Sequence, residues 1–237
     1  MRILAFKRVE KKYLINSEQY NLLLSKITDY MELDPYCNNN ATYKIQNIYY
    51  DTMDNYLITN SISKPVFKEK LRVRKYLSSD LYFIELKRKA CGVVGKRRVI
   101  VDEAELNRFF NGDDLDEITE YESKMAIKEI RYLLTRYTLS PKVYISYDRL
   151  GFFDRSDSSL RLTFDSNIHA RRDNLNFESD EFKTKIINDD EYLLEIKATN
   201  NYPLWLVKIL NECKIIPSSF SKYGTEYMMD IIGGKNV

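Results

Sequence analysis

Lysine and arginine recur at every second position in the first part of the stretch from residue 66 to 101, a spacing that could serve chemistry. Successive side chains of a β-strand point to opposite faces of the sheet, so residues two apart share a face. In VFKEKLRVRKY, one face would carry Lys68, Lys70, Arg72, Arg74 and Tyr76. This pattern predicts a strand with one cationic face and one largely apolar face.

The next two segments repeat this design. LYFIELKRKA places Glu85, Lys87 and Lys89 on one face. VGKRRVIV then places Lys96 and Arg98 together. For a single strand, the ordinary interpretation is the solvated face of an antiparallel sheet. Repetition of such faces in distant parts of the chain weakens that interpretation.

Distant segments of the chain carry similar faces. They contribute Arg8, Glu10 and Lys12, then Tyr147 and Arg149, then Arg161, Thr163 and Asp165, and finally Glu195, Lys197 and Thr199. If a closed sheet directs these faces inward, their like charges need an anion, because unpaired buried charge is very costly. The sequence therefore predicts a hydrated, positively lined cavity for a polyanion.

The whole chain is close to electrically neutral. Its 237 residues include 37 Lys and Arg against 35 Asp and Glu, a net charge of +2, so bulk charge does not predict a nucleic-acid binder. No linker or internal repeat is evident, and we expect one domain spanning residues 1–237. The sequence contains no run of about 18 apolar residues, so we expect no membrane-spanning helix.

Cysteine and histidine usage excludes several kinds of chemistry. The 3 cysteines include no CxxC pair, which favours reduced thiols and a cytoplasmic location. The only histidine is His169, so catalysis by a Ser-His-Asp triad, a Cys-His pair or an HExxH metal site is not expected.

Apolar periodicity and capping residues place helices between the strands. Ser17 is the expected N-cap of the first helix, Asp102 and Glu105 form a capping box, and Thr119 with Glu122 repeats that pattern. A further helix is expected from Pro203. Later strands are expected near 142–153, 160–168 and 191–199.

The motifs, taken in order, resemble a known family. FKRVEKKY, IYYDT, LRVRKY, FIELKRK, GKRR, YDR, RLTFD, LEIK and SFSKY resemble the VTC polyphosphate polymerase domain, a branch of the triphosphate tunnel metalloenzymes related to the CYTH proteins. The resemblance covers nearly the whole chain. It implies an α+β fold in which an antiparallel tunnel of about eight strands has helices packed outside.

The resemblance also implies roles for individual residues. Those expected to orient phosphates during catalysis are Lys12, Arg72, Arg74, Arg149 and Arg161. Those expected to bind phosphate are Arg8, Lys87, Lys96, Arg98, Tyr147, Lys197, Ser221 and Lys222. The expected ligands of a divalent metal, Mn²⁺ or Mg²⁺, are Glu195 first and then Glu85 and Glu10.

The function that the resemblance implies is ATP-dependent polyphosphate polymerisation, with ATP and inorganic polyphosphate or triphosphate as partners. Glu10 makes the first strand read RVEKK, partway to the ExExK signature of CYTH hydrolases, so hydrolysis of inorganic triphosphate is the alternative. A non-catalytic polyphosphate- or RNA-binding module is a third hypothesis. Eukaryotic polymerases of this type also carry an SPX domain and membrane helices. We expect a bacterial stand-alone type here, with any membrane protein as a separate partner.

Overall fold

A computed structural model describes residues 8–37, 41–91, 93–115, 117–179, 181–199 and 201–234. The elements in chain order are β1 (Arg8–Asn16), α1 (Ser17–Ile27), β2 (Met31–Leu33), β3 (Tyr43–Asp51), α2 (Tyr56–Ile62), β4 (Phe67–Tyr76), β5 (Tyr82–Ala90), β6 (Val93–Val101), α3 (Glu103–Asn111), α4 (Tyr121–Arg136), β7 (Ser140–Asp154), β8 (Arg161–Arg171), β9 (Thr184–Lys185), β10 (Glu191–Thr199), α5 (Leu204–Glu212) and α6 (Lys222–Gly234).

Hydrogen bonding joins the main strands in the order β1-β10-β8-β7-β3-β4-β5-β6. The short strands β2 and β9 pair with β7 and β8. The pairings of β1 with β10, β10 with β8, β3 with β4, β4 with β5 and β5 with β6 are antiparallel. The expected α+β arrangement, an eight-stranded antiparallel sheet with flanking helices, is confirmed.

The chain divides into two compact units, each assembled from three segments. Unit 1 comprises Met1–Tyr43, Tyr147–Ile168 and Ile187–Ser221, and unit 2 comprises Lys44–Ser146, His169–Ile186 and Lys222–Val237. Strands β3, β7 and β8 pass from one unit to the other. That the chain forms one domain stays a prediction.

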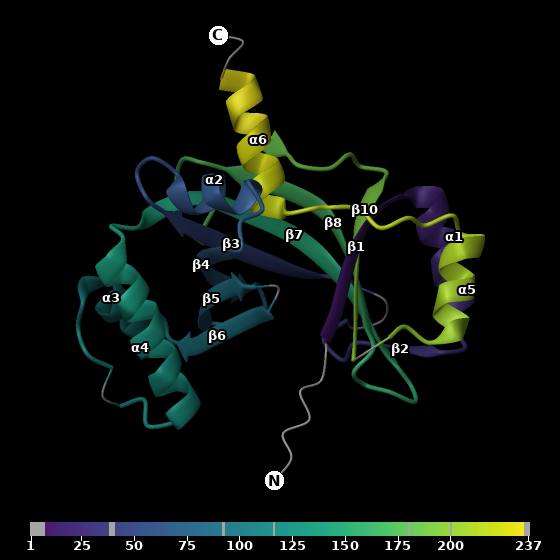
Figure 1. Cartoon of the computed structure of the whole chain (residues 1–237), viewed down its shortest axis with the longest axis horizontal. Coiled ribbons are helices and arrows are strands. Elements are labelled where there is room, and N and C mark those ends of the chain that lie inside the picture. Colours follow the sequence, from purple (N-terminus) through teal and green to yellow (C-terminus); the bar gives the residue numbers. More distant parts are fainter. Residues whose placement is uncertain are drawn as a thin grey trace. The chain divides into compact units, whose positions relative to one another are not determined.

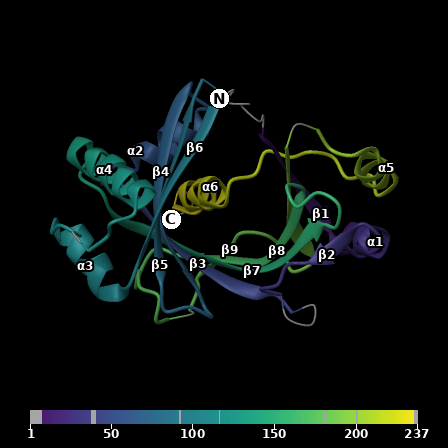
Figure 2. The same cartoon turned by 90° about the horizontal axis from the view of Figure 1, so that it is seen from below.

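In unit 2, alternation along β4, β5 and β6 separates an apolar face from the cationic one. Leu71, Ile84 and Val99 are fully buried on the apolar face. Helices α3 and α4 cover this face, as Figures 1 and 2 both show. The amphipathic period of α4 supplies Ile130 and Leu133 to the same core.

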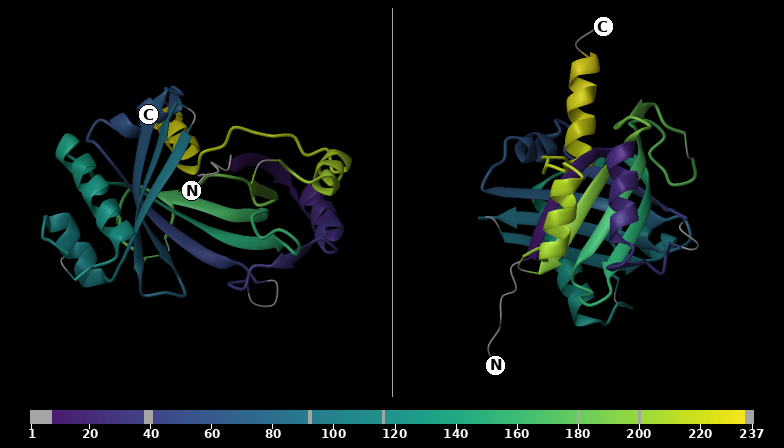
Figure 3. Two further views of the ribbon diagram at one scale, coloured as in Figure 1. Left: turned by 60° about the horizontal axis from the view of Figure 1, so that its bottom comes forward. Right: turned by 90° about the vertical axis from the view of Figure 1, so that its right-hand side faces the viewer.

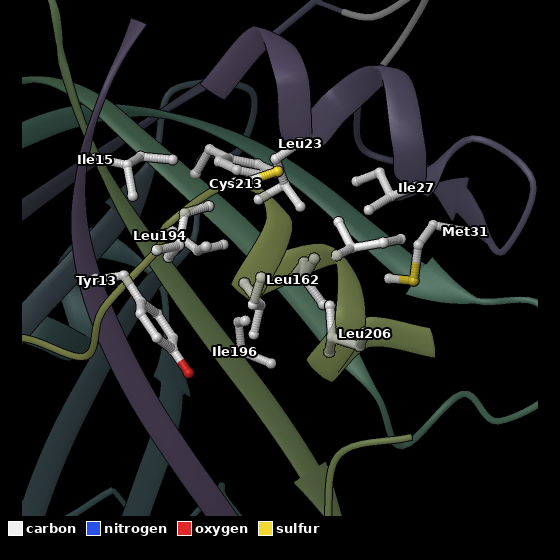
Figure 4. Close-up of a cluster of buried hydrophobic side chains, with 14 of the residues drawn as sticks. Tyr13, Ile15, Leu23, Ile27, Met31, Leu162, Leu194, Ile196, Leu206 and Cys213 are labelled. Atoms are coloured by element: carbon white, nitrogen blue, oxygen red, sulfur yellow. The ribbon is translucent and has the colours of Figure 1, made fainter. Parts of the chain in front are cut away.

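In unit 1, β1, β10 and β8 form a second two-faced surface. Tyr13, Leu194 and Phe164 are in register on its apolar face, where each is nearly fully buried. Helices α1 and α5 lie side by side against this face (Figure 3). Figure 4 shows Leu23 of α1 and Leu206 of α5 within this core.

Two of the predicted helix starts are wrong. Helix α1 is capped by Asn16, whose side chain accepts from the Gln19 amide, and not by Ser17. Helix α4 begins at Tyr121 without a side-chain cap, so the pattern of Thr119 and Glu122 does not form a capping box. Both errors arise because capping depends on where the backbone leaves its extended conformation, which the residue types do not specify.

Candidate functional site

One row of side chains crosses the cationic face of unit 2. Tyr49 of β3, Arg72 of β4, Glu85 of β5 and Arg98 of β6 are consecutive register partners. Register partners on one face of an antiparallel pair lie close enough to interact. Strand pairing therefore brings together side chains from the four strands β3, β4, β5 and β6.

Glu85 is the centre of this group, and only 2% of its surface is exposed. Arg72 donates from Nε to Oε2 at 2.8 Å, and Arg98 donates from Nε to Oε1 at 2.8 Å. Lys96 Nζ lies 2.7 Å from Oε1 and Arg74 Nε lies 3.9 Å from Oε2. We call these five residues the Glu85 cluster. Within it, four cations share one carboxylate.

The electrostatics of the Glu85 cluster follow from this geometry. Burial raises the pKa of Glu85, but the charges of Arg72, Arg74, Lys96 and Arg98 outweigh it and hold that pKa well below its ordinary value. Burial lowers the pKa of Lys96 to about 8, with Arg98 and Arg74 adding to the effect against the opposing pull of Glu85. Lys96 and Arg98 keep 43% and 36% of their side chains exposed, so a ligand can reach them.

Neighbouring polar groups hold two of the arginines in place. Arg74 donates from Nε to Asn47 Oδ1 at 3.0 Å, and Asn47 in turn donates to the carbonyl of Ile145 at 3.1 Å. Arg72 donates to the Tyr49 hydroxyl at 3.0 Å. The guanidinium groups are thus oriented before any ligand is bound.

Unit 1 carries a second cationic group on β1, β10 and β8. Lys12, Glu195 and Thr163 are register partners in one row, and Glu10, Lys197 and Arg161 are partners in the next. All six residues lie on the face opposite the apolar core, because they alternate with Tyr13, Leu194 and Leu162 along their strands.

Glu195 is the buried carboxylate of unit 1, with 8% of its surface exposed. Its Oε1 lies 2.5 Å from Lys197 Nζ and its Oε2 lies 4.0 Å from Lys12 Nζ. Burial raises the pKa of Glu195, but Lys197, Lys12 and Arg149 hold it well below its ordinary value. We call these four residues the Glu195 cluster.

Arg149 of the Glu195 cluster and Arg161 each form an ion pair with an aspartate. Arg149 binds Asp165 in a bidentate arrangement at 2.6 and 2.8 Å, with its guanidinium 5.3 Å from the centre of the Tyr147 ring. Arg161 donates to Asp34 at 2.6 Å. Charge-assisted pairs of this kind fix the plane of a guanidinium group. Asp165 thus holds the guanidinium group of Arg149 in place.

The other predicted site residues occupy varied positions. Lys87 is an exposed register partner of Lys96, Tyr147 is buried, and Glu10 is exposed. Ser221 and Lys222 are the residue before helix α6 and its first residue. The side chain of Arg8 lies outside the part of the chain that the structure describes.

Sequence reasoning missed three residues that hold the cations. Asp34 pairs with Arg161 from the loop after β2, Asn47 orients Arg74, and Tyr49 binds Arg72. No sequence pattern pointed to Asp34, because it and its partner Arg161 are 127 residues apart. Asn47 and Tyr49 are two apart in the sequence of β3, so a search for polar residues on one strand face could have found them.

The carboxylates suit a divalent metal only in part. Mg²⁺ sites often use one or two carboxylates, with water and substrate phosphates as the other ligands. The described residues contain no group of three or more His, Cys, Asp or Glu side chains that could hold a metal. Glu195 or Glu85 could therefore supply one oxygen ligand to Mn²⁺ or Mg²⁺, with phosphate oxygens completing the coordination.

Solved structures share this fold at low sequence identity. A "putative adenylate cyclase" of Bacillus halodurans has a TM-score of 0.54 and 15% identity, covering 90% of this chain and 93% of its own. A Pyrococcus horikoshii protein scores 0.49 at 14% identity, covering 94% and 99%. A Hippeastrum protein with a dominant triphosphatase activity scores 0.48 at 18% identity, covering 92% and 93%. The Bacillus structure therefore shares the fold of this chain.

The family is shown by sequence. The chain matches the VTC domain over residues 7–229 and belongs to that family. No curated protein matches the chain. Within the part of the chain that the structure describes, no helix is long and apolar enough to cross a membrane.

Proposed function

We propose that this protein is a phosphoryl-transfer enzyme that extends inorganic polyphosphate with the γ-phosphoryl group of ATP. The observation that carries the proposal is the Glu85 cluster, in which four cations share one buried carboxylate and two of them stay accessible. Membership of the VTC domain family supports the same substrate class.

The residues present suit this chemistry. In the proposed reaction, a terminal oxygen of the growing chain forms a bond to the γ-phosphorus of ATP. The bond from that phosphorus to the β–γ bridging oxygen breaks, and its electron pair leaves with ADP. Catalysis of such a transfer depends on positioning and on stabilising spread negative charge, so it needs no histidine nucleophile.

Each cluster has a role in the proposal. Arg72 and Arg74, oriented by Glu85 and Asn47, would bind phosphate oxygens, and Lys96 and Arg98 would add accessible charge. In unit 1, Lys12, Arg149 and Arg161 would likewise bind phosphate oxygens. A divalent metal bound through Glu195 would neutralise developing negative charge on the phosphates.

The test is the identity of the product. Purified protein incubated with ATP and Mn²⁺ should release ADP and build polyphosphate that a polyphosphatase degrades. A variant with Arg72→Gln should lose most of this activity, whereas Arg97→Gln, on the opposite face of β6, should retain it. Wild-type protein that yields neither ADP nor polymer from ATP would contradict the proposal.

Hydrolysis of triphosphate is the second candidate. The observation that favours it is Glu10, which lies one register row from Glu195 on the same face of β1 and β10. A hydrolase would release orthophosphate from tripolyphosphate without chain growth. The same preparation, supplied with tripolyphosphate in place of ATP, separates the two activities.

A further inference from the structure

Lysines continue the cationic face of unit 2 beyond the Glu85 cluster. Lys70 and Lys87 are register partners in the row next to Arg72, Glu85 and Arg98, and Lys96 of the cluster ends this row. Lys68 and Lys89 are partners in the row after that. Successive residues of a strand rise about 3.4 Å, so the four residues from Arg72 to Lys68 span about 14 Å along the strand.

The charge in these outer rows has one sign. Across β4, β5 and β6 the two rows contain Lys70, Lys87 and Lys96, and then Lys68, Lys89 and Val94, so neither includes a carboxylate. Glu69 lies between Lys68 and Lys70 in the sequence. Its side chain points to the other face of β4, where it binds Arg88 and Arg136.

Mutual repulsion is evident at Lys68. Burial lowers the pKa of Lys68, and the charges of Lys89, Lys64 and Lys87 lower it further. Lys68 is also held in place, because its Nζ donates to the carbonyl of Ser61 at 3.2 Å. Like charges held together in this way are stabilised by a ligand with several negative charges.

We propose that Lys68 and Lys89 form a track that binds the part of a polyphosphate chain beyond the Glu85 cluster and thereby sets the length of the product. This inference rests on the proposed polymerase function. The track continues the register rows of the Glu85 cluster, so a linear chain bound by Arg72 and Arg98 can extend along it.

The chemistry of the track favours polyphosphate over a nucleic acid. Single-stranded nucleic acids are held by aromatic side chains on which bases stack, in addition to backbone charge. The two outer rows contain no aromatic residue, and Phe67, next to Lys68 in sequence, alternates to the other face.

The experiment compares two variants of the full chain. Lys68→Gln with Lys89→Gln removes a cross-strand pair of the track, and Lys124→Gln with Lys128→Gln removes two exposed lysines from helix α4 as a matched control. Should the first variant fold poorly, Lys89→Gln alone replaces it, because that side chain is exposed and the hydrogen bond of Lys68 is kept.

Binding of long-chain polyphosphate should weaken several-fold in the track variant and not in the control, whereas binding of tripolyphosphate should be unchanged in both. With ATP and Mn²⁺, the track variant should release ADP at the wild-type initial rate but make shorter chains. The binding comparison stands even if no polymer forms, so failure of the polymerase function is separately visible.

Two results would overturn the inference. One is equal affinity of the track variant and the wild type for long-chain polyphosphate. The other is a single-stranded oligonucleotide that binds the wild type more tightly than polyphosphate does and loses its affinity in the track variant.

Discussion

Glu85 illustrates how one side chain can prepare a site for anions. Its carboxylate draws Arg72, Arg74, Lys96 and Arg98 to one point, although these cations repel one another. The sequence suggested Glu85 as a further metal ligand, and that role stays a prediction. The geometry also gives it a second role, as the counter-charge that keeps four cations in register.

Glu85→Gln should destabilise the ligand-free protein strongly. Removing one partner of a buried ion pair typically costs about 3–5 kcal/mol, because it leaves uncompensated charge. Tripolyphosphate should restore much of the loss by neutralising the same cations. Urea unfolding with and without tripolyphosphate measures both effects. Glu129→Gln on the opposite face is the control, and a similar response of the two variants to ligand would argue against the role of Glu85.

Thr163 is a buried polar residue of unit 1. Only 2% of the residue is exposed, and its hydroxyl has no hydrogen-bond partner among the described residues. It is the register partner of Glu195. An unsatisfied buried hydroxyl costs stability, so its presence beside a buried carboxylate suggests a contact made only with ligand.

Thr163→Val should therefore have opposite effects on stability and binding. Removing the unsatisfied hydroxyl should raise the free energy of unfolding by about 1 kcal/mol. Affinity for tripolyphosphate with Mn²⁺ should fall. Thermal unfolding and titration calorimetry measure the two quantities, with Thr199→Val on the same face as the control. A destabilised variant with unchanged affinity would show that the hydroxyl has a structural partner instead.

At the scale of elements, strand alternation could be predicted from the sequence and strand register could not. The period of two placed Arg72, Glu85 and Arg98 on cationic faces of the correct strands. Which residues face each other across strands depends on turn lengths and non-local pairing. The partners of Arg161 and Arg74 therefore emerged only from the structure.

Helix ends show the same limit. The capping box of Asp102 and Glu105 at α3 is confirmed, with both hydrogen bonds at 2.8 Å. The caps expected at Ser17 and Thr119 are wrong. A capping sequence caps a helix only where the preceding strand ends at the capping residue. Pairing in the sheet determines where that strand ends.

Asp102→Ala should lower the stability of the protein without changing its affinity for ligand. Loss of the cap should lower the free energy of unfolding by about 1 kcal/mol. Affinity for tripolyphosphate should stay at the wild-type value, because α3 packs on the apolar face of β6. Chemical denaturation and titration calorimetry test this. A marked loss of affinity would mean that α3 positions the cationic face.

At the scale of the whole molecule, the net charge of +2 conceals strong local charge. Each unit carries its own buried glutamate surrounded by cations, Glu85 in unit 2 and Glu195 in unit 1. Local clusters, and not the sum of charges, should therefore govern binding of anions.

Salt should consequently weaken ligand binding more than it weakens the fold. The Debye length falls from about 10 Å at 0.1 M to about 3 Å at 1 M salt, and exposed charges such as Lys96 and Arg98 are screened most. Buried pairs such as Arg149 with Asp165 should persist. Measuring tripolyphosphate affinity and unfolding over a salt series tests this. An affinity that is independent of salt would contradict it.

The most direct test of the central claim is a crystal structure of the protein with a non-hydrolysable ATP analogue and Mn²⁺. The account predicts phosphate oxygens within hydrogen-bonding distance of Arg72 and Arg98 of the Glu85 cluster. Phosphates bound elsewhere, with the Glu85 and Glu195 clusters unchanged and free of ligand, would contradict it.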